Sequence, residues 1–287
     1  MAISTRGALI NSYKHFFIAV DSFENRLLKG RMFHESMEEA AAFSCLTELV
    51  VTLERLFDKL QYPMKSVQQR SFNRKLTEAF PGEIPHEIKN TGKDRKGTLS
   101  NFLLQVKYRF YASWQGEVTD LSDGSGISFA SLIELMDYLG ERLGGIDRER
   151  GAGCGRQVGS SSGLCDGRYV IEGNPASPAV EGLPVFVNGY QIKEVIESMA
   201  MPFLKGEMNH MIPITLQVAA EGVEFETFIV RVLFKRNGTW QGTIGWREKR
   251  IQVSFRSFLE ILLLIHEAVN QRELCFGIEA DQSNSEI

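Results

Sequence analysis

One short pattern that occurs three times constrains the fold more than any other feature of this sequence. Gly30, Gly116 and Gly242 are each followed thirteen residues later by a phenylalanine. The phenylalanines are Phe43, Phe129 and Phe255, and at fixed offsets beyond them stand a large apolar residue (Leu46, Leu132, Phe258), a glutamate (Glu48, Glu134, Glu260) and another aliphatic residue (Leu49, Leu135, Ile261). Matches at several offsets in three places indicate an internal duplication.

The residues around each glycine predict a β-hairpin. Apolar residues alternate with others at Leu104, Val106, Tyr108 and Phe110 in the second copy and at Phe228, Val230, Val232 and Phe234 in the third. Such alternation is typical of a strand with one apolar face, and Asn237-Gly238 is a hairpin-turn signal. We expect the glycines to admit a helix or an aromatic ring against the sheet. The polar residues that alternate with these are expected to face water. Gln115 and Gln241 are among them and are candidate binding residues.

The repeated phenylalanine is expected to open an amphipathic helix. Ser131 and Ser257 are each followed three residues later by the repeated glutamate, which is the pattern of a capping box. In the first copy Cys45 takes the place of the serine. We interpret the three glutamates as helix caps rather than as an acidic cluster.

The third helix has an apolar band, Ile261–Ile265, on every side, so its own sheet does not suffice to cover it. Either the first two copies or a second subunit must supply another cover. We favour a symmetric dimer through this helix, with Leu263 and Leu264 as candidate contact residues.

These patterns predict an α+β protein of three repeated ββα units in two lobes, with mainly antiparallel sheets and helices packed on one face. Residues 1–147 would hold the first two copies, 148–175 a Gly/Ser-rich linker or long loop, 176–278 the third copy, and 279–287 a polar tail. Within the second lobe, Asn188-Gly189 is expected to form a turn, 192–199 a short helix and 212–218 a strand.

The composition is that of a folded, soluble protein, with 43% hydrophobic and 24% charged residues in a chain of 287. No apolar run is long enough to cross a bilayer, and no export signal is evident, so we expect a cytoplasmic location with reduced cysteines. The net charge of −4 disfavours a chain devoted wholly to nucleic acid.

No segment assembles a recognisable catalytic, cofactor or metal site. Residues 159–163 match the G-x-S-x-G pattern but lack the strand and helix that a nucleophile elbow requires. Three His-Glu pairs, at His34, His86 and His266, lack the second histidine of a zinc motif. His266 is expected to be a partly exposed residue at a helix end. We therefore expect no cofactor, no metal and no enzyme activity.

One segment, residues 65–109, is rich in cations interleaved with aromatic residues. Its candidate binding residues are Lys65, Arg70, Arg74, Lys75, Lys93, Arg95 and Lys96. Such a segment is compatible with a phosphate backbone or an acidic protein face. The irregular spacing of the cations also fits a solvated connector between repeats, which we favour.

The third copy, with Trp240-Gln241-Gly242 and Ser254-Phe255-Arg256-Ser257, resembles a group of uncharacterised bacterial proteins in which a W-Q-G strand precedes an S-F-R-S-x-L-E-L-like helix. The resemblance implies a bacterial module and no particular activity. We expect a binding protein whose partner is another protein or a second copy of itself, with no membrane partner. Nucleic-acid binding through residues 65–109 is one alternative, and an enzyme without a recognised motif is another.

Overall fold

The computed structural model describes residues 14–72, 95–151, 168–171, 188–207, 211–218 and 226–276. The first half contains β1 (Phe16–Glu24), β2 (Leu27–Phe33), β3 (Ala41–Phe43), α2 (Leu46–Leu60), β4 (Ser100–Tyr108), β5 (Gln115–Asp120), β6 (Gly126–Phe129) and α3 (Leu132–Gly151). The second half contains β7 (Arg168–Ile171), α4 (Gly189–Leu204), β8 (Ile214–Val218), β9 (Glu226–Arg236), β10 (Thr239–Trp246), β11 (Ile251–Phe255) and α5 (Phe258–Phe276).

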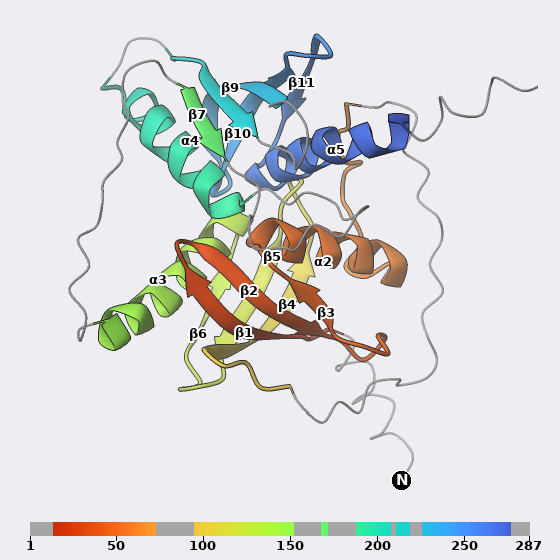
Figure 1. Ribbon diagram of the computed structural model, residues 1–287, viewed down its shortest axis with the longest axis vertical. Helices are drawn as coiled ribbons and strands as arrows, with labels where there is room; N and C mark the ends of the chain where they lie inside the picture. Colours follow the sequence, from red (N-terminus) through yellow and green to blue (C-terminus); the bar gives the residue numbers. More distant parts are fainter. Residues whose placement is uncertain are drawn as a thin grey trace, which may run out of the picture.

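The strands form two sheets, and the four helices of the described ranges lie between them (Figure 1). The first sheet has the order β3-β2-β1-β4-β5-β6 and the second the order β11-β10-β9-β8-β7. Neighbouring strands in these sheets are antiparallel, except that β7 and β8 are parallel. Helices α2 and α3 pack on the first sheet, and α4 and α5 on the second. The predicted α+β class, with helices on one face of each sheet, is confirmed.

A third strand precedes each helix that follows the repeated glycine, so the predicted ββα order is wrong. The phenylalanine ends this strand instead of opening the helix, and it pairs with the glycine in all three places, as Gly30↔Phe43, Gly116↔Phe129 and Gly242↔Phe255. A Cβ atom on Gly242 would lie 3.0 Å from Cζ of Phe255 and 1.8 Å from the Arg231 carbonyl oxygen. Close approach of a ring and of the neighbouring backbone therefore explains the glycine.

A β-bulge interrupts each hairpin at the same position relative to this glycine. The extra residue is Asp21 in β1, Lys107 in β4 and Leu233 in β9. Beyond a bulge the alternation of side chains is shifted by one residue, so residues that would have faced the core face solvent and the reverse. Arg109 is consequently buried, at 4% exposed. The predicted apolar face is wrong at its end, because Tyr108, Phe110 and Phe234 are 53, 45 and 47% exposed.

The three helices begin where the capping pattern predicts, one residue after Cys45, Ser131 and Ser257. The main-chain N–H of Glu134 donates to Oγ of Ser131 (3.3 Å), and that of Glu260 donates to Oγ of Ser257 (3.0 Å). The glutamate side chains reach one residue further back than a capping box requires. Glu48 accepts the main-chain N–H of Ser44 (2.7 Å), Glu134 accepts that of Ala130 (2.8 Å), and Glu260 accepts that of Arg256 (2.7 Å). Capping therefore accounts for all three carboxylates.

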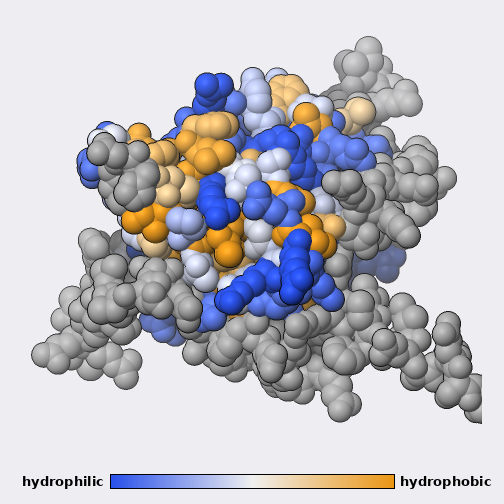
Figure 2. All heavy atoms as spheres, turned by 90° about the horizontal axis from the view of Figure 1, so that it is seen from above, coloured by the Kyte–Doolittle hydropathy of each residue, from blue (hydrophilic) through white to orange (hydrophobic). Residues whose placement is uncertain are grey.

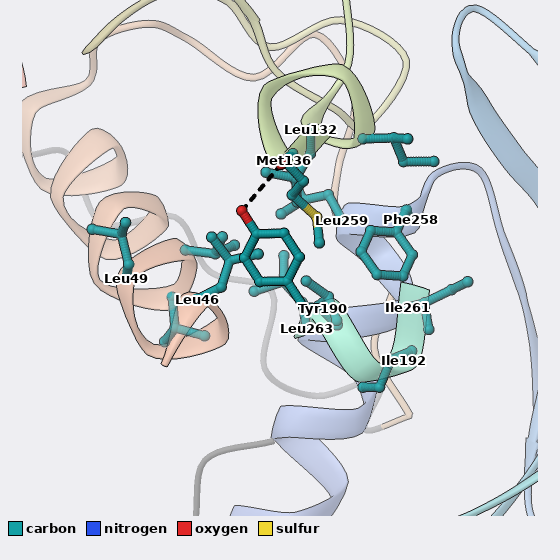
Figure 3. Close-up of a cluster of buried hydrophobic side chains, with 14 of the residues drawn as sticks. Leu46, Leu49, Leu132, Met136, Tyr190, Ile192, Phe258, Leu259, Ile261 and Leu263 are labelled. Carbon is teal, nitrogen blue, oxygen red and sulfur yellow. Dashed lines mark hydrogen bonds between the residues drawn. The ribbon is translucent and has the colours of Figure 1, made fainter. Parts of the chain in front are cut away.

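The apolar band of α5 is buried inside this chain. Its residues are at most 8% exposed, namely Ile261, Leu262, Leu263, Leu264 and Ile265. Helices α2 and α3 supply the second cover, and Figure 3 shows Leu259 and Leu263 of α5 facing Leu46 of α2 and Met136 of α3. Leu263 and Leu264 are thus core residues rather than an exposed contact surface, and the band requires no second subunit.

The two predicted lobes share one hydrophobic core, which runs from Phe16 to Val269. Within the predicted linker, α3 continues to Gly151 and β7 pairs with β8, while the rest of 148–175 and the tail 279–287 lie outside the described residues. Asn188 is not a turn residue, because its Oδ1 accepts the N–H of Tyr190 (3.1 Å) and caps α4. No helix in the described ranges is long and apolar enough to cross a membrane.

Candidate binding groove between two hairpin tips

A groove lies between the tip of the β4–β5 hairpin and the β9–β10 hairpin. Its volume is about 530 Å³, and it is lined by Ser66, Val67, Phe110, Tyr111, Phe234, Arg236, Asn237, Gln241 and Arg256. Sites for small ligands or single side chains fall in this size range and usually combine apolar walls with a few polar groups.

Each hairpin tip is fixed to the start of a helix from the opposite sheet. Oγ of Ser131, the cap of α3, donates to the Gly238 carbonyl oxygen (2.9 Å). Reciprocally, Oγ of Ser257, the cap of α5, donates to the Ala112 carbonyl oxygen (2.5 Å). These crossed bonds hold the two walls of the groove at a set separation.

The two glutamines predicted to face water instead brace the hairpins. Nε2 of Gln115 donates to the carbonyl oxygens of Phe110 (3.0 Å) and Ala130 (3.2 Å). Nε2 of Gln241 makes the equivalent bonds to Arg236 (3.0 Å) and Arg256 (3.1 Å). Their acceptor atoms differ, because Oε1 of Gln115 accepts the N–H of Phe110 (2.8 Å), whereas the buried Oε1 of Gln241 has no partner among the described residues. The Gln241 side chain therefore braces its hairpin through its donor atom alone.

Exposed aromatic rings dominate the groove and its rim. Tyr111 is 57% exposed, and Tyr108 stacks on Phe110 with ring centroids 5.1 Å apart. Figure 2 shows that, on the face seen from above, apolar side chains lie in small groups separated by hydrophilic ones. A cluster of exposed aromatic rings on such a surface is typical of a contact site.

The turn that carries Tyr111 has an unusual sequence for its backbone. Tyr111 and Ala112 both have φ of 56°, in the left-handed region. The third hairpin places Asn237 and Gly238 at the same two positions, with φ of 52° and 70°. Asn-Gly suits this turn, whereas a left-handed tyrosine and alanine cost stability. Strain of this kind gathers at functional sites.

The groove carries two arginines on its apolar background. Arg236 and Arg256 line it, and no Asp or Glu does so among the described residues. Nε of Arg256 is bonded to the buried Glu260 (3.2 Å). Arg236 makes no ion pair with the described residues, and its guanidinium lies 5.5 Å from the centroid of the Phe234 ring.

Behind the Phe110–Tyr111 tip lies a buried ionic network that the bulge creates. Arg109 bonds to Glu54 of α2 and, through Nη1, to Oδ1 of Asp58 (2.7 Å). Oε1 of Glu54 also accepts Nε1–H of Trp114 (2.6 Å). A small adjacent cavity of about 20 Å³ has room for roughly one water molecule and not for a substrate. We interpret the network as a support for the tip.

The cations of residues 65–109 that the structure describes do not gather into one surface. Lys65 pairs with Asp58 (2.6 Å), and Arg70 contributes its main-chain N–H to Glu260 (3.3 Å). Lys96 lies by the first sheet, where its carbonyl oxygen accepts Nη2–H of Arg31 (3.1 Å), and Arg95 precedes it. Arg74, Lys75 and Lys93 lie outside the described residues, as do the G-x-S-x-G stretch and His86.

Two buried groups that could be reactive, Cys45 and Lys193, are held in their protonated forms. Burial raises the pKa of the Cys45 thiol to about 12, so the thiolate is scarce at neutral pH. Burial lowers the pKa of Lys193, but its bonds to Asp137 (2.8 Å) and Glu197 (2.7 Å) outweigh this and raise it above its usual value. No cluster of three or more His, Cys, Asp or Glu suited to a metal ion occurs in the described ranges.

No family model, curated protein or solved structure gives a significant match to this chain. The resemblance carried by Trp240-Gln241-Gly242 stays a prediction. Phe110 and Phe234 were missed from sequence because alternation assigned them to the apolar face, and Tyr111 was not singled out. One sequence signal does point to them, namely Tyr111-Ala112 at the turn where the third copy has Asn237-Gly238.

Proposed function

We propose that this chain is a non-enzymatic binding protein that takes a short segment of a partner protein into the aromatic groove. The observation that carries the proposal is the set of exposed rings, Phe110, Tyr111 and Phe234, held between two anchored hairpin tips. Aromatic side chains supply much of the free energy of protein recognition, and a fixed site loses little entropy on binding.

The charges of the groove favour a segment that is both apolar and acidic. Arg236 is free of ion pairs with the described residues, so a carboxylate of the partner would gain a charge-assisted bond without displacing another.

We further propose that the three glycine–phenylalanine segments are copies of one βββα unit. The shared glycine–phenylalanine pair, the shared bulge and the shared glutamate cap support this origin. In this view the groove forms where the second and third copies face one another, and the second copy has replaced an ordinary turn with Tyr111.

Nucleic-acid binding is the second candidate, because rings beside arginine also suit stacked bases. Two observations favour a protein partner over it. Lys65, Lys107 and Arg109 are neutralised by carboxylates of the chain itself, and the whole chain is acidic, with a net charge of −4. These three cations would therefore contribute little to binding a phosphate backbone.

A displayed library of random peptides, selected on the immobilised full-length chain, tests the proposal. We expect enriched peptides to pair an aromatic or aliphatic residue with Asp or Glu. The double variant Tyr111→Ala/Phe234→Ala should bind these peptides at least about tenfold more weakly by fluorescence anisotropy, the effect of losing a binding hot spot. Leu121→Ala, which removes an apolar side chain 45% exposed and outside the groove, is the control and should leave affinity unchanged.

Peptides that bind the double variant as tightly as the wild-type chain would rule out the groove as the site. Labelled oligothymidine provides the comparison for the second candidate. Its binding, if lost in the double variant and weakened by salt, would favour nucleic acid instead.

A further inference from the structure

The outer edge of β11 belongs to the longest edge strand whose side chains the structure describes. β11 has five residues, compared with three in the edge strand β3 and four in the edge strand β6. It pairs with β10 on one side, and no described strand pairs with its other side. Ile251 is 38% exposed, and Gln252 and Ser254 are also exposed. An unpaired edge of this kind can accept an added strand.

The surroundings of this edge are basic. Arg247, Lys249 and Arg250 are exposed in the turn that leads into β11, and Arg256 follows the strand. The one carboxylate of the turn, Glu248, accepts the main-chain N–H of Thr227 (3.0 Å). The edge strand β6 differs, because the two carboxylates of Asp120 and Asp123 beside it share the single cation Arg142 and leave no excess of positive charge there. Charge complementarity thus selects an acidic strand for β11.

The same edge leads into the aromatic groove. Arg256 comes directly after the last residue of β11 and lines the groove, and Gln241, on the neighbouring strand β10, bonds to the Arg256 carbonyl oxygen. A strand that lay along β11 would therefore reach the groove at one of its ends.

We propose that the partner segment adds to the outer edge of β11 as an extended acidic strand, with an apolar side chain at one end entering the aromatic groove. This inference rests on the proposed function and adds the conformation and charge of the ligand. Main-chain bonds along the edge would supply affinity, and the groove would supply selectivity for the terminal side chain.

Basic residues also protect edge strands against aggregation, and this role alone predicts no ligand. A second copy of the chain is a poor occupant. Antiparallel pairing of two β11 strands would bring Arg247 and Lys249 of each copy toward Arg256 of the other, and like charges that face each other across a pair are destabilising.

The test uses a labelled, end-capped peptide of sequence FDVEVDF, which alternates and carries an apolar ring at both ends, with FKVKVKF as its charge control. Binding to the full-length chain is measured by fluorescence anisotropy at low salt. Only FDVEVDF should bind, and Arg247→Glu/Lys249→Glu should weaken it about tenfold. Lys59→Glu/Lys205→Glu makes the same change in net charge at exposed positions away from β11 and the groove, and should have little effect.

Two N-methylated forms of FDVEVDF then test strand addition itself. A strand donates to its neighbour through alternate residues, so methylation of one alternate set should abolish binding while methylation of the other leaves it nearly unchanged. Equal effects of the two sets would overturn strand addition and leave the groove proposal standing. No binding of FDVEVDF, or concentration-dependent self-association through β11, would also overturn the inference, while the displayed library still decides the proposed function.

Discussion

Two residues at the groove have left-handed backbone, a conformation that Asn25, Arg26, Gln61 and Arg250 also adopt elsewhere in the described chain. Tyr111 and Ala112 occupy left-handed backbone positions for which the third hairpin uses Asn237 and Gly238. The ring of Tyr111 is more than half exposed, so burial in the chain does not compensate for the strain. The exposed ring is the part of this turn that the proposed partner would contact.

Replacing this turn by the preferred one should separate stability from binding. We expect Tyr111→Asn/Ala112→Gly to raise the free energy of unfolding by about 1 kcal/mol, because left-handed backbone is easier for Asn and Gly. The same variant should lose affinity for peptides selected on the wild-type chain. Urea denaturation and anisotropy measure the two effects. Asn237→Ala is the matched change in the tip of the other hairpin and should lower the free energy of unfolding by a similar amount. A Tyr111→Asn/Ala112→Gly variant that is less stable than the wild-type chain would contradict the strain argument.

His266 should make the folding stability depend on pH. It is buried in α5 rather than partly exposed at a helix end, and burial, with a smaller effect from Arg55, lowers its pKa to about 4. The unfolded chain, with an ordinary histidine pKa near 6.5, then binds more protons between about pH 6.5 and 4, so stability falls as the pH falls through that window. We expect a loss on the order of 1–3 kcal/mol, measured by urea denaturation. His266→Gln should flatten this part of the profile, and an unchanged slope would refute the assignment.

At the scale of elements, the bulged hairpin with its third strand is the structure on which the groove depends. The bulge lets the neighbouring backbone approach the repeated glycine, and it turns Tyr108, Phe110 and Phe234 outward. The same shift carries Arg109 inward to Glu54, so one irregularity produces both the exposed rings and the buried support behind them.

Two glycines of β10 provide a matched test of this element. A Cβ on Gly242 would lie 1.8 Å from the Arg231 carbonyl oxygen, whereas a Cβ on Gly245 would meet only ordinary contacts at 3.8 and 3.9 Å. We expect Gly242→Ala to lower the free energy of unfolding by about 3 kcal/mol, because backbone atoms must move. Gly245→Ala should change it by less than about 1 kcal/mol in either direction. Chemical denaturation decides, and equal effects would mean that the bulge does not impose the glycine.

At the scale of the whole molecule, two sheets share one core through the helices that lie between them. Phe258, Leu259 and Ile261 of α5 lie beside residues of α2, α3 and α4, as Figure 3 shows for Leu46, Met136 and Ile192. Oη of Tyr190 donates to the Met136 carbonyl oxygen (3.1 Å) and ties α4 to α3 within this cluster. The two halves of the chain therefore depend on each other for burial of their apolar faces.

This arrangement predicts how the chain responds to a charge in the centre. Leu264 is fully buried, and Leu264→Lys should cost several kcal/mol, roughly the lost burial plus an unpaired charge, so we expect loss of the folded state. Circular dichroism and light scattering should show an unfolded or aggregated variant and a wild-type monomer at low concentration. Leu233→Lys, at a position 48% exposed, is the surface control and should stay folded. If the wild-type chain were a dimer and the Leu264→Lys variant a folded monomer, the dimer hypothesis would be restored.

Short-range patterns in the sequence were enough to determine the α+β class, the starts of α2, α3 and α5, their glutamate caps and the need for a second cover over α5. These features depend on neighbours within a few turns of helix or along one hairpin, where spacing fixes which groups meet. The tertiary structure alone decided the rest. The bulges turned Tyr108, Phe110 and Phe234 outward, the third strands formed by pairing with the strands that carry the repeated glycines, and α2 and α3 covered α5. The groove belongs to this second group, because Tyr111 and Phe234 meet only when two hairpins from different sheets are anchored on each other's helices.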